Sequence, residues 1–182
     1  METENQSSFA SPIQNAIKHG LITGGLLILY SLLTYALDMM QNRALSYVSF
    51  ILMVGGMYYG TKVYRDQVLG GMISYSKAFG SAFLIGVIAS LFLSVYIFFF
   101  YRFFAPEMIE VLLDQAEQEI LRSRPGISDE ELDMALSMAT KFTSPVWLSV
   151  LGFFTNAIVS LIIGLILGLL LRREDPQTRQ MI

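Results

Sequence analysis

Residues 78–101 read AFGSAFLIGVIASLFLSVYIFFFY, and this stretch contains no acidic, basic or histidine residue. A helix of about 20 residues is needed to cross the hydrocarbon core of a bilayer, which is roughly 30 Å thick. In lipid, every backbone N–H and C=O group must bond within the segment, and a helix achieves this. Because the stretch is apolar on all faces, it predicts a membrane-spanning helix rather than a core helix of a water-soluble domain.

Three further tracts lack charged residues in the same way. They are residues 20–37, 44–61 and 142–171. Over the whole chain, 54% of residues are hydrophobic and only 15% are charged, whereas a typical soluble domain carries about 25% charged residues. The sequence therefore predicts an all-α membrane protein with four transmembrane helices and an extramembrane helical hairpin between the third and the fourth.

Two of the tracts have an alternative interpretation. The first has the position of a signal peptide, but Glu2 and Glu4 precede it. Its apolar run is also too long, and no Ala-x-Ala cleavage site follows it. The second is the least hydrophobic and holds Gly55, Gly56 and Gly60, which makes a re-entrant segment the alternative. A full span satisfies its backbone in lipid, so we expect both tracts to cross the membrane.

The spans divide the chain. We expect a disordered or short interfacial segment at 1–16, three spans within 17–105, the hairpin at 106–143, the fourth span at 144–173 and a flexible tail at 174–182. Four spans place both termini and the 62–77 loop on one side, with seven basic residues: Lys18, Lys62, Arg65, Lys77, Arg172, Arg173 and Arg179. Five basic residues lie on the other side. The positive-inside rule then predicts cytoplasmic termini, with residues 102–144 in the periplasm or outside the cell.

The segment 107–141 is strongly acidic and has helical periodicity. Its nine acidic residues are Glu107, Glu110, Asp114, Glu117, Glu119, Asp129, Glu130, Glu131 and Asp133, against three basic ones. One apolar stripe consists of Ile109, Leu112, Leu113, Ala116 and Ile120, and a second of Leu132, Ala135, Leu136, Ala139 and Phe142. The dipeptide Pro125-Gly126 separates the stripes as a turn. Ser128 and Glu131 have the spacing of a capping box, in which each side chain bonds the backbone N–H of the other.

The two stripes are expected to pack on each other and on the membrane face, or to dock a second copy of the chain or an envelope protein. A divalent cation bound by the acidic residues is an alternative, but no loop has EF-hand spacing, and a charge run is usually a solvated face. The chain has no cysteine and one histidine. We therefore predict no metal ligand, no cofactor and no catalytic residue. With a net charge of −3 and no basic cluster, we expect no nucleic-acid partner.

Small residues recur at four-residue spacing inside the spans. They are Gly20 and Gly24, Gly56 and Gly60, and Ser160, Gly164 and Gly168. Such rows let helices approach closely in lipid, within one chain or between chains. Asn156 is the most polar residue deep in a span. It is expected to form an interhelical hydrogen bond, or alternatively to mark a transport pathway.

The chain resembles a bacterial membrane family, the domain-of-unknown-function family 4199, over roughly residues 13–175. The resemblance rests on Gly71-Met72-Ile73-Ser74-Tyr75, Ala78-Phe79, Pro106-Glu107, Ser128-Asp129-Glu130-Glu131, Ser144-Pro145 and Arg172-Arg173 in this order. It implies a small inner-membrane protein and brings no activity or site residues with it.

Three functions are therefore expected in descending order. The first is a non-enzymatic assembly or interaction protein that acts through the hairpin. The second is a small transporter or channel subunit with a pathway near Asn156. A membrane enzyme comes last, because no nucleophile–base pair or metal set is visible in the sequence.

Overall fold

The computed structural model describes residues 12–40 and 42–173. The expectations for residues 1–11 and for the tail at 174–182 fall outside the described residues. The helices are α1 (Pro12–Ala36), α2 (Arg43–Val63), η2 (Tyr64–Val68), α3 (Tyr75–Phe99), η3 (Phe100–Phe104), α4 (Met108–Ser123), α5 (Asp129–Phe142) and α6 (Pro145–Leu171). The short elements η2 and η3 are π-helical turns that extend α2 and α3. The described fold is therefore helical, apart from one isolated bridge between Ile73 and Arg173.

Three helical segments are long and apolar enough to cross a membrane. They are α1, α3 together with η3, and α6. These three segments are compatible with a multi-pass membrane protein, as the sequence predicted. The helix α2 has 21 residues but is not among the three, because its glycines and tyrosines dilute its apolar residues.

Two prolines and one asparagine mark where the helices begin. Pro12 and Pro145 are the first residues of α1 and α6, a position at which the missing N–H of proline costs no intrahelical bond. Asn42 caps α2, because its side chain accepts a hydrogen bond from the Ala44 N–H at 2.9 Å. The helix α1 thus begins before residue 17, where the first transmembrane region was expected.

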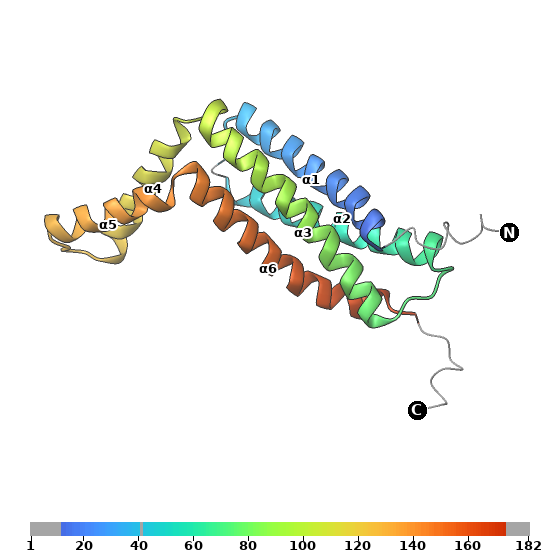
Figure 1. Ribbon diagram of the computed structural model, residues 1–182. Coiled ribbons are helices and arrows are strands. Elements are labelled where there is room, and N and C mark those ends of the chain that lie inside the picture. Colours follow the sequence, from blue (N-terminus) through green and yellow to red (C-terminus); the bar gives the residue numbers. More distant parts are fainter. Residues whose placement is uncertain (1–11, 41, 174–182) are drawn as a thin grey trace. The chain divides into compact units, whose positions relative to one another are not determined.

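The described chain forms two compact units. The first consists of the described parts of Met1–Leu93 and Phe154–Ile182, and its four long helices lie side by side (Figure 1). A Cβ atom built on Gly20 would lie 2.8 Å from Ile88, and one built on Gly24 would lie 3.0 Å from Phe92, so α1 runs parallel to α3. By the same measure Gly60 meets His19 and Gly168 meets Tyr75. The helix α2 therefore runs antiparallel to α1, and α6 runs antiparallel to α3.

The helices α1 and α2 are joined by hydrogen bonds in addition to apolar packing. The Asn15 amide donates to the Gly60 carbonyl at 3.1 Å, and the Tyr30 hydroxyl donates to the Leu45 carbonyl at 2.9 Å. His19 is buried and its Nδ1 lies 2.9 Å from the Asn15 carbonyl. A carbonyl can only accept, so Nδ1 carries a proton. This histidine is thus part of the helix packing rather than the interfacial side chain typical of a span boundary.

The second unit, Ser94–Phe153, contains α4, α5 and the adjoining ends of α3 and α6. The helices α4 and α5 contact each other, and Gly126 with φ +88° makes the turn between them. The first predicted stripe and the residues from Leu132 to Ala139 of the second are half-buried. Phe142 is not, since 51% of it is exposed. Its ring contacts Trp147 instead.

Candidate functional site

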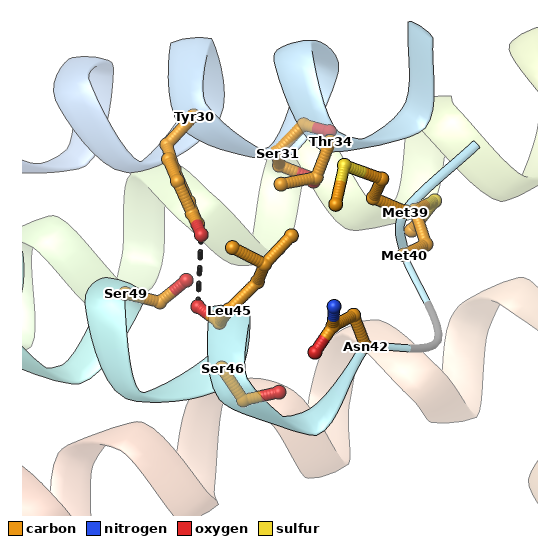
Figure 2. Close-up of a pocket in the computed structure, with 9 residues that line it drawn as sticks. All are labelled: Tyr30, Ser31, Thr34, Met39, Met40, Asn42, Leu45, Ser46 and Ser49. Carbon is orange, nitrogen blue, oxygen red and sulfur yellow. Dashed lines mark hydrogen bonds between the residues drawn. The ribbon is translucent and has the colours of Figure 1, made fainter. Parts of the chain in front are cut away.

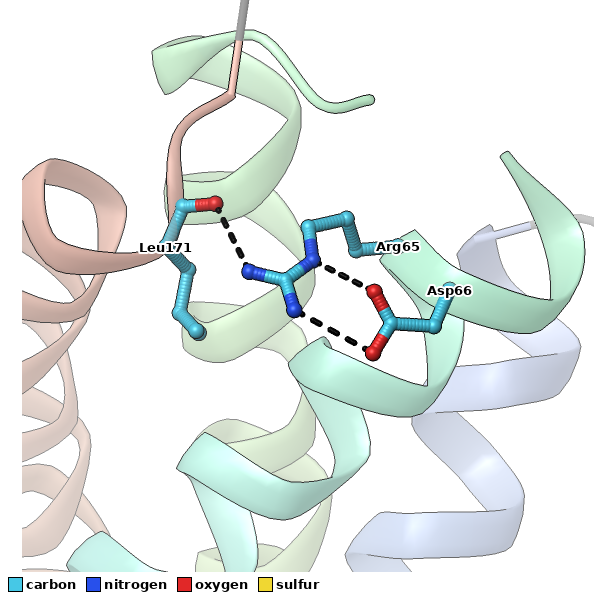
Figure 3. Close-up of polar contacts among 3 residues, drawn as sticks. All are labelled: Arg65, Asp66 and Leu171. Carbon is cyan, nitrogen blue, oxygen red and sulfur yellow. Dashed lines mark hydrogen bonds and ion pairs between the residues drawn. The ribbon is translucent and has the colours of Figure 1, made fainter. Parts of the chain in front are cut away.

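Arg65 is a buried arginine at one end of the first unit. It stands in η2, just beyond the end of α2, and is only 6% exposed. Its Nε donates to Asp66 Oδ1 at 2.6 Å and its Nη2 to Asp66 Oδ2 at 3.1 Å, which is a bidentate pair. Its Nη1 donates to the Leu171 carbonyl at 3.4 Å (Figure 3). That carbonyl belongs to the last turn of α6, where backbone oxygens lack an intrahelical partner.

Backbone bonds join the same three segments. The Gly71 N–H donates to the Arg65 carbonyl at 2.8 Å, and Ile73 and Arg173 exchange two bonds of 2.9 and 2.8 Å. Gly70 and Gly71 have positive φ values, which glycine adopts readily. We call Arg65, Asp66, Leu171 and the Ile73–Arg173 bridge the polar clasp. It fixes the end of η2, the turn into α3 and the end of α6 to one another.

Burial of Arg65 changes the charge at this end of the bundle. The hydrogen bond from Arg65 holds the pKa of Asp66 below its usual range, and the charges of Arg65, Lys62 and Arg173 add to this. Arg65 was predicted as one of the cations that orient the protein, but its charge is neutralised by Asp66. The exposed cations at this end are Lys18, Lys62, Lys77, Arg172 and Arg173.

Acid is expected to weaken the polar clasp only below about pH 4. The folded-state pKa of Asp66 is depressed, so the stability it contributes is present above the unfolded value of about 3.9 and is lost as the pH falls through the folded value. The melting temperature in detergent should therefore stay level from pH 8 to pH 5 and fall further down. Asp66→Asn should abolish this fall in melting temperature at low pH, whereas the control Asp38→Asn, at an exposed position, should not change it. An unchanged fall in Asp66→Asn would contradict the assignment.

A small pocket of about 170 Å³ lies where α1 turns into α2 (Figure 2). It is lined by Tyr30, Ser31, Thr34, Met39, Met40, Asn42, Leu45, Ser46 and Ser49. Side chains of α1 and α2 face each other across it, and the Tyr30–Leu45 hydrogen bond closes one side. Its lining offers hydroxyls, one amide and two thioethers but no charge, which suits a small neutral molecule better than an ion. No pattern in the sequence predicted this pocket.

The small residues predicted to pack helices all lie at helix contacts within the chain. Gly56 faces Thr23 across the α1–α2 contact, and Gly164 faces Phe79 across the α3–α6 contact. Ser160 faces Gly86 of α3, a small residue that was not among those predicted to pack helices. Gly86 belongs to a row of small residues that recur at every fourth position of α3. All five are buried: Ala78, Ala82, Gly86, Ser90 and Ser94. That row was visible in the sequence as small residues, alanine, glycine or serine, at every fourth position.

Residues 18–173 match the family described as protein of unknown function (DUF4199). The match covers more than half of the chain. The chain belongs to the DUF4199 family. No curated protein and no solved structure matches it.

The remaining predicted residues of this DUF4199 protein are not members of the polar clasp. Asn156 is half-buried in α6, and its backbone carbonyl accepts a hydrogen bond from the Ser160 hydroxyl at 2.6 Å. Ser128 caps α5 by accepting from the Glu131 N–H at 3.3 Å. Among the described residues, no group of three histidine or acidic side chains lies close enough to hold a metal ion.

The outer face of α4 is the most distinctive surface in the second unit. Leu121 is 45% exposed, and Glu117, Asp114 and Glu110 precede it by four, seven and eleven residues. These spacings put all four residues on one helix face. An exposed leucine among acids on a helix with no buried residue offers a partner both apolar area and charge. We call these four residues the acidic face.

Proposed function

We propose that this protein is a non-enzymatic, four-span protein of the bacterial inner membrane that assembles with a second copy or an envelope partner through α4 and α5. The observation that supports this function best is Leu121, an apolar side chain left exposed at the C-terminal end of the acidic face. Apolar anchors surrounded by polar residues are typical of protein interfaces. The helices α4 and α5 would form the extramembrane hairpin.

The parallel packing of α1 and α3 supports a fourth span. If both helices cross the membrane in the same direction, the chain must return across it between them. The helix α2 occupies that part of the sequence, runs antiparallel to α1, and has the length that a span needs. The exposed lysines and arginines at the polar-clasp end favour a cytoplasmic position for that end and hence for both termini.

Single cysteines test this topology without background, because the chain has no native cysteine. Cysteine at Ser46 or Ser137 is expected to react with a membrane-impermeant maleimide applied from outside the cell membrane. Cysteine at Met72 is expected to react only after the membrane is opened, since Met72 lies in the turn at the polar-clasp end. Labelling of Met72→Cys from outside would contradict the proposed orientation. If one of positions 46 and 137 were labelled from outside and the other only after the membrane is opened, α2 would not cross the membrane.

Assembly is tested by changing the acidic face. Leu121→Lys, or Glu110→Gln combined with Asp114→Asn, is expected to reduce oligomer size or partner recovery in mild detergent. Deletion of 107–141 with a short linker should have the same effect. Alanine at Gln115 and Gln118, which are exposed on the same helix, is the matched control. If neither the acidic-face variants nor the deletion change oligomer size or partners, the proposed function is wrong.

The alternative is a small transporter or channel subunit with a pathway near Asn156. Two buried hydroxyls, Thr61 and Ser81, have no hydrogen-bond partner within the described part of the chain. Unpaired polar groups inside a membrane bundle favour a functional interpretation. Flux in liposomes that is lost in Asn156→Leu would favour this alternative.

A further inference from the structure

One side of α5 carries an exposed apolar row that α4 does not cover. Met134, Met138 and Phe142 follow one another at four-residue spacing and are 63%, 60% and 51% exposed. The residues of α5 that share its half-buried side are Leu132, Ala135, Leu136 and Ala139. We call the exposed residues the Met–Phe row. An apolar row of this kind is unfavourable when it is exposed to water, so it indicates a surface that is covered by another molecule.

The Met–Phe row continues into the apolar surface of α6. The Phe142 ring lies 5.8 Å from the Trp147 ring, in an edge-to-face arrangement. Trp147 is itself 46% exposed and stands in the first turn of α6, a helix apolar enough to span a membrane. Val146 and Val150 beside it are also exposed. Tryptophan at the start of a span belongs in the headgroup layer, so the row begins where the lipid surface is.

The hydroxyl groups at the junction are already satisfied without water. Thr140 donates to the Leu136 carbonyl at 2.9 Å, Thr143 to the Ala139 carbonyl at 2.8 Å, and Ser144 to the Lys141 carbonyl at 2.9 Å. Each bond runs back three or four residues along the same backbone. A hydroxyl paired in this way enters a poorly hydrated layer at little cost, since the penalty of burial falls on unpaired polar groups.

We propose that α5 lies in the lipid–water interface, with the Met–Phe row inserted at the boundary between headgroups and acyl chains. Lipid is favoured over a protein partner because the row is continuous with the membrane-facing start of α6. Lys141 at the near end can extend its charge to the headgroups while its methylene stem covers apolar surface. The acids Asp129 and Glu130 stand at the other end of the helix. This inference uses the proposed four-span topology and adds a membrane anchor to it.

Spin labels on single cysteines test the proposal in the full-length protein, reconstituted in vesicles of zwitterionic phosphatidylcholine. Labels at Met134 and Met138 should show severalfold higher accessibility to oxygen relative to a water-soluble nickel reagent than labels at Asp133 and Ser137. Two labelled positions are used on each side of α5, so the comparison can still be made if one variant does not fold. The helical phase of the accessibility along α5 is the expected signature of an interfacial helix.

Two outcomes would overturn the proposal. Equal access of the nickel reagent to all four positions would mean that α5 projects into water. Shielding of Met134 and Met138 from both reagents, with immobilised labels, would mean that protein covers the row. The test is independent of the assembly function. Lipid-accessible methionines together with unchanged oligomers in the Leu121→Lys variant would keep the anchor and reject assembly through the acidic face.

Discussion

Gly86→Ala is expected to destabilise the bundle by about 1–3 kcal/mol, the usual cost of overpacking a core. A Cβ atom at residue 86 would lie 2.5 Å from Ser160 Cβ and even closer to Ser160 Oγ. The Met57 sulfur, 3.2 Å away, closes the remaining side. Neither helix can yield without separating α3 from α6, because Ser160 is fully buried. Thermal or SDS-induced unfolding in detergent measures the loss, and Gly86→Leu should prevent recovery of folded protein.

Gly80 in the same helix supplies the matched control. A Cβ atom there meets nothing within 4 Å, so Gly80→Ala should be neutral or slightly stabilising. Ser160→Gly removes the obstacle itself. In that background Gly86→Ala should cost much less than it does alone, which a double-mutant cycle reports as a coupling between the two positions. Equal losses at residues 80 and 86, or additive effects with Ser160→Gly, would refute a steric contact between Gly86 and Ser160.

The sequence predicted the long apolar helices, three of which are compatible with crossing a membrane, and most small residues at the helix contacts, because both follow from local patterns. Charge-free length marks a span, and four-residue spacing of glycine puts small residues on one face. Gly86 was missed because its nearest glycine, Gly80, is six residues away and its buried neighbours at fourfold spacing are alanine and serine. Which small residue meets which helix depends on contacts between remote segments. Gly86 and Ser160 belong to different spans, so no local pattern pairs them.

The polar clasp could not be predicted from charge counting. Arg65 lies in a polar loop by sequence, and such arginines are normally exposed. It becomes buried because η2 extends α2 by another turn and brings the guanidinium to the last carbonyls of α6. The neighbouring Asp66 was the available signal, since an adjacent carboxylate can neutralise a buried arginine. Phe142 shows the opposite error: helical spacing assigned it to the apolar stripe of α5, whereas its side chain is 51% exposed and its ring contacts Trp147.

Asp66→Asn is expected to lower the melting temperature of the bundle by several degrees, and by more than Arg65→Met does. The asparagine leaves the Arg65 guanidinium, 6% exposed, without a counter-ion, and an unpaired buried charge is more costly than a lost ion pair. Methionine at position 65 fills the same space without a charge. The group that then loses its ion-pair partner is the Asp66 carboxylate, whose side chain is 40% exposed and stays in contact with water.

The double variant Arg65→Met with Asp66→Asn separates charge burial from packing. It should melt above Asp66→Asn alone, because the unpaired guanidinium is gone, and close to Arg65→Met. Lys62→Met is the control, since Lys62 is an exposed cation in the last turn of α2 and should change the melting temperature little. Some loss should remain in every variant that lacks Arg65, because the Leu171 carbonyl then has no Arg65 Nη1 donor. A larger loss in Arg65→Met than in Asp66→Asn would show instead that the bond to α6, rather than neutralisation of a buried charge, is the main contribution of the polar clasp.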